Sequence, residues 1–424
     1  MKLITTCTVV SLLCPVEIGW SADPLDNWTT STVPTTNSSG TLFRMASVAF
    51  GNGRLVGGGA VSDQEEQFIA AMLFYSSDGA TWTRNPIAVP SLVSITWGNG
   101  QFCAVGLNGL VLTSADGISW TEHSAGTTNS FYAITYGNRE FVAVGSGPPG
   151  SGLGAFVASS PDGVTWTPWY WAPQLGWDNP GSFGVVAYGN NKFVALGQGL
   201  NYISVATSVD GVNWTQHPAA GPSAYQGGTS ALTFGSGLFV AVGGYLLNAP
   251  ASQEHATIWT SPDGLNWSLQ LDKTNVCAYP GVAFTSVAYG AGQFVVSGPV
   301  LDPTNGRPVI WTSSNGTNWV VRDVPASPSV LTFRNGRFLG LSGTTALQSG
   351  VIGKLGASLS PGSGVQGTLT GVTGQQYAVQ SSTNLVTWSL LTNITINTNG
   401  LAQFSDPAVT NFSHLFYDAR LSEQ

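Results

Sequence analysis

The chain has 424 residues, of which 42% are hydrophobic, 11% aromatic and only 8% charged, and it contains 54 glycines and 15 tryptophans. A disordered chain has many charges and few aromatic residues, so this composition excludes one and predicts a folded protein. The net charge of −8 and the lack of any lysine or arginine cluster exclude a protein that follows nucleic-acid phosphates. Beyond the N-terminal segment, no apolar run is long enough for a membrane-spanning helix.

The N-terminal segment, residues 1–22, has the pattern of an export signal. Lys2 supplies a positive charge, Leu3–Leu13 forms an apolar stretch, and Ser21–Ala22 places small residues before the expected cleavage site. We therefore expect a Sec signal peptide and a secreted, periplasmic or cell-surface protein. Two alternatives stay open. One is an ordinary N-terminal strand, and the other is lipidation at Cys14, which is disfavoured because a leucine stands where a lipidation motif has a small residue.

A hairpin pattern recurs seven times along the chain. Each copy has an apolar run that ends in an aromatic residue, then a turn rich in glycine and asparagine, and most copies continue into a second apolar run. Glycine and asparagine tolerate the positive φ of a tight turn, so each copy predicts a strand, a turn and a strand. The strands are apolar on both faces, which indicates sheets packed on each side. The copies are 48–53, 95–100, 134–138, 186–190, 232–237, 287–292 and 331–336.

A second pattern recurs six times between the hairpins: serine, any residue, aspartate or asparagine, glycine, two further residues and tryptophan. In such a turn the short polar side chain accepts hydrogen bonds from backbone N–H groups, glycine takes the left-handed conformation, and tryptophan packs between sheets. The acceptor residues are therefore predicted to be structural; they are Asp78, Asp116, Asp162, Asp210, Asp263 and Asn315. The pattern resembles the Asp box, or bacterial neuraminidase (BNR) repeat, of the sialidase-like and photosystem-assembly-factor-like β-propeller superfamily.

The two patterns alternate, so each repeat unit is predicted to have four strands. The tryptophans of successive second patterns are 38 to 53 residues apart, which is the length of a propeller blade. The seventh unit lacks the second pattern, but Asp26–Thr29 copies the sequence around those tryptophans. A strand there would complete the last blade and remove its open edge. We predict an all-β fold with a seven-bladed β-propeller over residues 24–352, closed by the N-terminal strand.

A smaller domain is predicted after the propeller. Residues 353–374 are rich in glycine, serine and proline and form a predicted linker. Residues 375–424 show alternating apolar positions, as in Tyr377–Trp388, and turn signals such as Asn399–Gly400. They predict a small antiparallel, sandwich-like β-domain. This segment resembles the C-terminal β-modules that end many large secreted bacterial proteins, a resemblance that implies surface association or sorting.

The connections between blades, and those in the middle of each blade, vary in length and are expected on the face opposite the short turns. Variable loops on a rigid ring commonly carry binding groups, so this is the predicted ligand face. One loop, 169–180, has several aromatic residues that can stack on sugar rings and polar groups that can bind hydroxyls. Its candidate ligand-binding residues are Trp169, Tyr170, Trp171, Gln174, Trp177 and Asp178. The alternative is that these aromatics cover the central channel or the C-terminal domain.

Catalysis is not predicted by any motif of the chain. The resemblance to sialidases implies an arginine triad and a Phe/Tyr-Arg-Ile-Pro signature, but the nearest segment, Phe43–Met45, lacks the proline. Arg54, Arg139 and Arg337 follow hairpin turns and therefore belong to the opposite face. A glycoside hydrolase with two flanking carboxylates is the alternative, with Asp178 paired to Glu65 or Glu66.

We therefore predict an exported, non-catalytic propeller that acts as a binding or scaffold module for carbohydrate or a cell-surface protein. His123 and His217 lie three residues after a repeat tryptophan, which marks them as repeat positions rather than metal ligands. No metal, cofactor, nucleic acid or transmembrane segment is expected, and the expected state is a monomer.

Overall fold

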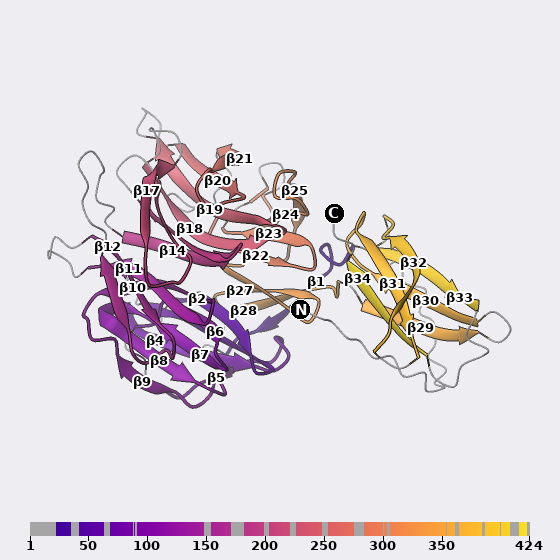
Figure 1. Cartoon of the computed structure of the whole chain (residues 1–424), viewed down its shortest axis with the longest axis horizontal. Helices are drawn as coiled ribbons and strands as arrows, with labels where there is room; N and C mark the ends of the chain where they lie inside the picture. The colour runs from indigo at the N-terminus through magenta and orange to yellow at the C-terminus, as the bar shows by residue number, and fades with distance from the viewer. Residues whose placement is uncertain are drawn as a thin grey trace. The chain divides into compact units, whose positions relative to one another are not determined.

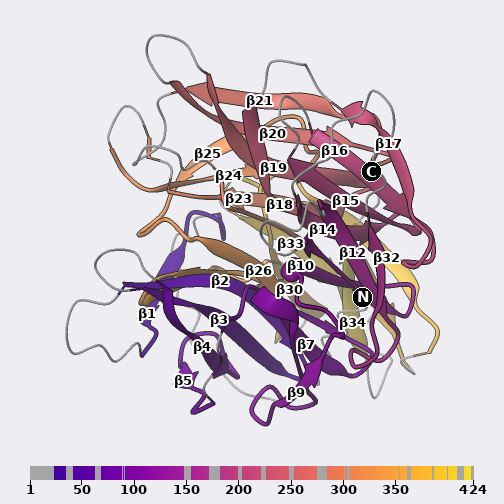
Figure 2. The same cartoon turned by 90° about the vertical axis from the view of Figure 1, so that its left-hand side faces the viewer.

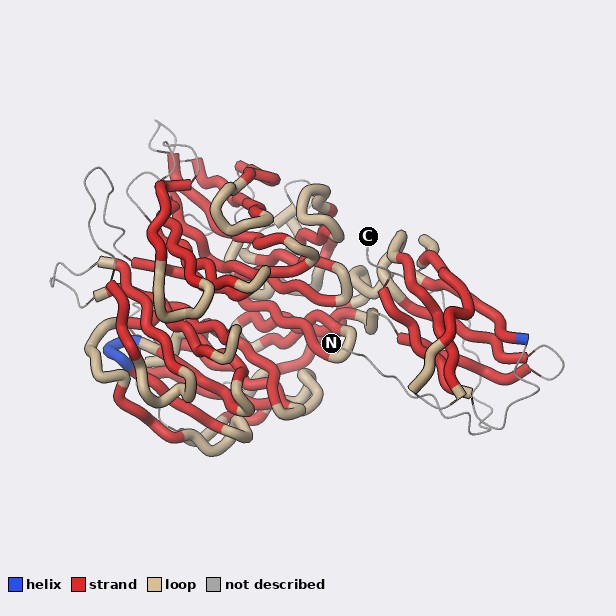
Figure 3. Tube along the Cα trace, in the orientation of Figure 1, coloured by secondary structure: helices blue, strands red, loops and turns tan. Residues whose placement is uncertain are grey.

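The computed structural model of the chain describes residues 23–34, 42–62, 68–87, 89, 91–147, 154–170, 182–198, 203–220, 226–247, 253–274, 284–299, 301–302, 306–352, 354–360, 364–383, 386–398, 400–407 and 415–421. These residues form two compact units. The first is Thr30–Arg334 with Phe338–Gln348, and the second contains Asn335–Arg337 together with the described residues before Thr30 and after Gln348. Figure 3 shows strand and loop almost throughout, apart from short 3-10 segments such as η1 (Leu107–Gly109).

Seven four-stranded antiparallel sheets, or blades, occur among the described residues. Six of them pair four strands in chain order, as the hairpin repeats predict. These are β2 (Leu42–Gly51), β3 (Arg54–Ser62), β4 (Phe68–Ser76) and β5 (Thr83–Arg84) in blade 1; β6 (Ser94–Gly98), β7 (Gln101–Val105), β8 (Leu110–Ser114) and β9 (Thr121–Ser124) in blade 2; β10 (Ser130–Gly137), β11 (Glu140–Ser146), β12 (Ala155–Ser160) and β13 (Thr167–Tyr170) in blade 3; β14 (Ser182–Gly189), β15 (Lys192–Gln198), β16 (Ile203–Ser208) and β17 (Thr215–Ala220) in blade 4; β18 (Gln226–Gly235), β19 (Leu238–Leu247), β20 (Gln253–Ser261) and β21 (Ser268–Thr274) in blade 5; and β22 (Ser286–Gly290), β23 (Gln293–Ser297), β24 (Val309–Ser313) and β25 (Val320–Asp323) in blade 6.

Blade 7 is made from both ends of the propeller sequence. Its strands are β26 (Val330–Arg334), β27 (Arg337–Ser342), β28 (Thr345–Ser349) and, on the outer edge, β1 (Trp28–Thr32). The first strands of neighbouring blades contact one another around the whole ring, including β26 with β2 (Figure 1, Figure 2). The predicted fold class, a seven-bladed propeller closed by an N-terminal strand, is confirmed.

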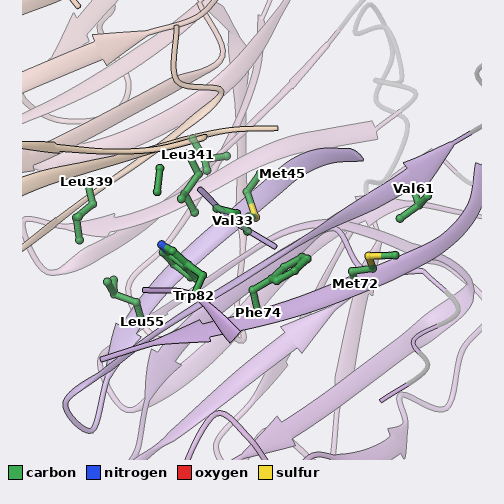
Figure 4. Packing of buried hydrophobic residues seen from close by; sticks show 11 residues of the cluster. Val33, Met45, Leu55, Val61, Met72, Phe74, Trp82, Leu339 and Leu341 are labelled. Carbon is green, nitrogen blue, oxygen red and sulfur yellow. The ribbon is translucent and has the colours of Figure 1, made fainter. Parts of the chain in front are cut away.

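The seam between blades 7 and 1 has a continuous apolar core. Val33, directly after β1, is 1% exposed and belongs to one cluster with Met45 and Phe74 of blade 1 and Leu339 and Leu341 of blade 7 (Figure 4). Its backbone N–H also donates to the Thr344 carbonyl at 2.7 Å. The closing strand is therefore held by burial as well as by strand pairing.

The seams near the inner edge of the blades repeat one contact. The aromatic residue of each first strand lies against the glycine that ends the first strand of the preceding blade, and a Cβ at Gly98, for example, would overlap the ring of Tyr136. At the closing seam Arg334 stands in place of this glycine. Its Cζ lies 4.3 Å from the centroid of the Phe50 ring, and its Nη2 donates to the Gly53 carbonyl at 3.2 Å. A cation–π contact therefore replaces the close aromatic–glycine contact at the closing seam.

The C-terminal β-domain is described by itself. Its two three-stranded sheets have the orders β29 (Lys354–Ser360), β30 (Gly364–Thr370), β33 (Leu401–Asp406) and β32 (Ser389–Thr395), β31 (Gln376–Ser382), β34 (Phe416–Leu421). Apolar side chains from both sheets, including Leu369, Val379 and Phe404, form one buried cluster, as in a β-sandwich. Strands β29 and β30 lie within residues 353–374, so the prediction of a linker there is wrong: the apolar residues between the glycines and serines, Leu355 among them, are buried in this cluster. Within it, the Tyr417 hydroxyl donates to Asp406 Oδ2 at 3.0 Å, so this buried polar pair is satisfied.

Candidate functional site

The six turns predicted from the second pattern share one geometry, and we call them the capped turns (76–82, 114–120, 160–166, 208–214, 261–267 and 313–319). In blade 3, Asp162 Oδ1 accepts hydrogen bonds from the backbone N–H groups of Val164 and Thr165, both at 2.9 Å. Ser160 Oγ donates to Asp162 Oδ1 at 3.0 Å and accepts from the Gly163 N–H at 2.8 Å. Each acceptor therefore satisfies N–H groups that the tight turn leaves without a strand partner.

The capped turns hold their carboxylates ionised. Hydrogen bonds from the backbone N–H groups of Thr81, Ser119 and Thr165 lower the pKa of Asp78, Asp116 and Asp162, respectively. In the sixth turn the Asn315 side-chain oxygen accepts the same bonds, at 3.0 and 2.9 Å. The position therefore requires a hydrogen-bond acceptor rather than a negative charge, which agrees with a structural role.

The hairpin turns of blades 1 to 4 are bonded to the capped turns of the next blade. Asn99 donates its Nδ2 to the Pro161 carbonyl at 3.2 Å, and Asn52, Asn138 and Asn190 make the corresponding bond in their own seams. Each of these asparagines has a φ between 44 and 48°. The first residue of the second strand adds another bond: Gln101 Nε2 donates to the Asp162 carbonyl at 2.7 Å. This end of the ring, the turn face, therefore holds neighbouring blades together.

The opposite end, the loop face, carries the connections between second and third strands and between blades, because each sheet is an antiparallel meander. Blade 5 extends toward this face with two ten-residue strands, β18 and β19. His255 of β20 lies 2.6 Å from Asp272 of β21, measured from Nδ1 to Oδ1, and is 8% exposed. This bond fixes the orientation of the imidazole and joins the outer strands of blade 5.

Two of the predicted ligand-binding residues lie on β13, the outer strand of blade 3. Trp169 is half-buried and its ring centroid is 6.3 Å from that of Trp214 in blade 4. Tyr170 is 39% exposed; its ring stacks on Phe156 with a centroid distance of 6.0 Å, and its hydroxyl accepts from Asn129 Nδ2 at 3.3 Å. Both side chains thus contact the propeller itself. Trp171, Gln174, Trp177 and Asp178 lie outside the described residues, as do Glu65 and Glu66.

Trp169 occupies a position that recurs in other blades, three residues after the tryptophan of the capped turn. In four other blades the residue here bonds to the hydroxyl of a threonine on the neighbouring strand, at 2.7 to 3.0 Å. The pairs are His123 with Thr113, His217 with Thr207, Gln270 with Thr260 and Arg322 with Thr312. Burial, together with the charge of Lys192, lowers the pKa of His217. The prediction that both histidines are repeat positions agrees with this pattern.

Three features of the described residues were not predicted from the sequence: the His255–Asp272 pair, the Arg334–Phe50 contact, and the position of Glu140 against the capped turn of blade 4. In the sequence, Arg334 departs from the glycine of the other repeats, and Glu140 is the one acidic residue at a position that is otherwise arginine, glutamine, lysine or leucine. Over the described ranges, no group of three or more His, Cys, Asp or Glu residues has the arrangement of a metal site. In the same ranges, no helix is long and apolar enough to cross a membrane.

Comparison with known proteins points to the fold. No family model and no curated protein sequence matches the chain. The solved structure of YCF48 bound to a D1 peptide is similar over 80% of this chain and 100% of that chain, with 16% identity and a TM-score of 0.50. The propeller domain of the Trilobed protease from Pyrococcus furiosus (6% identity; 72% and 91% covered; TM-score 0.43) and the WD40 domain of Toxoplasma gondii coronin (9%; 77% and 87%; 0.45) are more distant. Together with its seven four-stranded sheets, the likeness to the YCF48 structure identifies the chain as a β-propeller.

Proposed function

We propose that the chain is an exported, non-catalytic propeller that binds carbohydrate or a cell-surface protein on its loop face. The observation that carries this proposal is the different use of the two faces. The turn face is occupied by bonds between blades, such as those of Asn99 and Gln101 to the capped turn of blade 3. At the loop face the bonds between blades come from residues at or next to the ends of the inner strands, such as that from the Phe131 N–H to the Gly106 carbonyl at 3.1 Å. The connections beyond these residues can therefore vary and carry ligand groups.

We further propose that the capped turns are Asp boxes, which would place the chain among the BNR-repeat propellers. Support comes from the agreement of sequence and geometry in all six copies. In each one the serine hydroxyl accepts from the glycine N–H at 2.8 or 2.9 Å. In each one the tryptophan Nε1 donates to that glycine's carbonyl at 2.9 to 3.3 Å.

The bonding of the described side chains favours binding over catalysis. A carboxylate such as Asp162 is held ionised by N–H donors and is poorly suited to give a proton as a general acid at neutral pH. Arg54 and Arg337 donate to the backbone carbonyls of Asp116 and Ser349, and Arg334 lies over an aromatic ring. These arginines support the ring, whereas a sialidase-like site needs arginines directed at its substrate.

The proposed ligand chemistry rests on the loop predicted over residues 169–180. Trp171 and Trp177 would stack on sugar rings, and Gln174 and Asp178 would bind hydroxyls. The few charges of the chain predict binding with little dependence on salt. The YCF48 structure carries a bound peptide, so a protein ligand is the other form of this proposal.

A glycan array with the full chain tests the proposal. Each stacked aromatic residue contributes on the order of 1 kcal/mol beyond its buried area, so changing Trp171 and Trp177 together to alanine should weaken binding by about 1.5–3 kcal/mol, or about 10- to 150-fold. Thr165→Ala, on an exposed position of the turn face, is the control and should bind as the unchanged chain does. Absence of glycan binding would leave the surface-protein form of the proposal.

Fluorogenic sialosides and a panel of β-glucans test the alternative of a glycoside hydrolase. Turnover that is lost in Asp178→Asn or Glu65→Gln would contradict the non-catalytic proposal. Export is tested separately by N-terminal sequencing of the mature protein, which should begin near Asp23.

A further inference from the structure

The first residue of the second strand has a repeated task at the seams of the turn face. In blade 2, Gln101 Nε2 donates to the carbonyl of Asp162 in the capped turn of blade 3, at 2.7 Å. In blade 4, Lys192 Nζ donates to the Asp263 carbonyl of blade 5 at 3.2 Å. Arg54 of blade 1 donates to the corresponding carbonyl of blade 2. In all three seams a side-chain N–H group satisfies a carbonyl of the neighbouring capped turn.

In blade 3 this position is held by Glu140, which pairs with Gly137 as Gln101 pairs with Gly98. Its neighbour across the seam is the capped turn of blade 4, where a Cβ on Gly211 would lie 3.3 Å from Glu140 Cβ. Glu140 Oε2 is buried and makes no hydrogen bond. A carboxylate has no proton to donate, so the ionised form cannot make the bond that Gln101 makes.

The charged groups around Glu140 disfavour its ionised form. Asp210 of the blade 4 capped turn and Asp162 of the blade 3 capped turn both act on it with like charge. Arg139 precedes it in the hairpin turn, where its side chain is exposed. Lys192, the equivalent residue of blade 4, donates to the Asp263 carbonyl of blade 5.

We propose that Glu140 is a proton-dependent latch between blades 3 and 4, which donates to the Asp210 carbonyl when protonated and loses this bond when ionised. Protonation supplies the missing O–H donor and removes the repulsion from the two aspartates. The latch makes the seam between blades 3 and 4 tighter in acid than at neutral pH.

The direction of the effect follows from linkage. Burial, with the like charges of Asp210 and Asp162, raises the pKa of Glu140 above its ordinary value of 4.5. A group whose pKa is raised by folding contributes its full stabilisation below the ordinary value and loses it as the pH rises through the raised value. The contribution of Glu140 is therefore present at pH 4 and lost toward pH 8.

Thermal unfolding of the full chain, followed by tryptophan fluorescence, tests the latch with two reciprocal variants. Glu140→Gln supplies a permanent donor, so it should raise the Tm by about 1–3 °C at pH 8 and leave it within about 1 °C at pH 4. Gln101→Glu places the same carboxylate in the seam between blades 2 and 3, so it should lower the Tm at pH 8 by more than at pH 4. An effect of Glu140→Gln that is equal at both pH values would overturn the proposal.

A second measurement needs no variant. The side-chain carboxyl ¹³C signal of Glu140, in the unchanged protein, should titrate above pH 4.5. Titration at or below the ordinary pKa would show that the ionised form is not disfavoured in the seam and would refute the latch.

Discussion

The substitution Val33→Ala tests the closure of the ring in its core. Val33 is 1% exposed and contacts a cluster that includes Met45 and Leu341 on the two sides of the seam. The change removes two methyl groups, each worth about 0.8 kcal/mol of burial, and leaves a cavity whose cost adds to that loss. We expect a destabilisation of about 2–3 kcal/mol. With the usual unfolding entropy per residue, this lowers the Tm of the propeller by about 3–5 °C.

The assay is thermal unfolding followed by tryptophan fluorescence, with Thr30→Ala as the matched control. Thr30 is exposed on β1, the strand that ends just before Val33, so its loss should change stability by at most about 0.5 kcal/mol. Removing residues 24–34 altogether should expose the edge of β28 and lower the Tm further than either substitution. Equal effects of the two alanine variants, or an unchanged Tm after the deletion, would refute the conclusion that this strand closes the ring.

Two further predictions concern the capped turn of blade 3. Ser160→Ala leaves the buried Gly163 N–H without its acceptor, so it should cost about 1–3 kcal/mol in urea unfolding. Asp162→Asn should be mild at pH 7, because an asparagine fills this position in the sixth turn. The Thr165 N–H lowers the pKa of Asp162, so its contribution is present above the ordinary value of 3.8 and is lost as the pH falls through the lowered value. The advantage of the unchanged protein over Asp162→Asn should therefore shrink between pH 5 and pH 2.5, measured as the difference in Tm. A cost of Ser160→Ala no larger than that of Thr165→Ala, or a growing advantage in acid, would contradict these assignments.

The sequence predicts the fold because each blade repeats the same local chemistry. Each turn is formed by residues that are only a few positions apart: glycine and asparagine in the hairpin turns, and the serine–aspartate caps in the capped turns. Such local interactions leave a recognisable pattern in the sequence. Closure by β1 was predictable for the same reason, since Asp26–Thr29 copies part of the repeat. The Trp28 Nε1 donates to the Leu25 carbonyl at 2.7 Å, three residues back, as the tryptophans of the capped turns do.

The features that sequence reasoning missed depend on distant partners. Arg334 departs visibly from the glycine of other repeats, but its contact with Phe50 exists only because the ring closes. The His255–Asp272 pair depends on the pairing of β20 with β21, whose register shifts between Ile258 and Trp259. A shift of this kind changes which side chains meet across the strands, and no residue pattern in the sequence marks it.

The division between the two faces of the ring can be tested by insertion. Residues 148–153 of blade 3 lie outside the described residues, and the two residues that flank them are joined by a hydrogen bond of 3.0 Å from the Gly147 N–H to the Gly154 carbonyl. Three added residues, Gly-Ser-Gly, should cost well under about 0.6 kcal/mol there, because loop-closure entropy grows only slowly with length. The same insertion between Pro161 and Asp162 breaks the cap within the turn and the bonds from Asn99 and Gln101 of blade 2. At about 1 kcal/mol for each lost bond, that variant should lose roughly 3–4 kcal/mol in urea unfolding. If both insertions are equally costly, the loop face is not free to vary, and the argument that it carries the ligand fails with it.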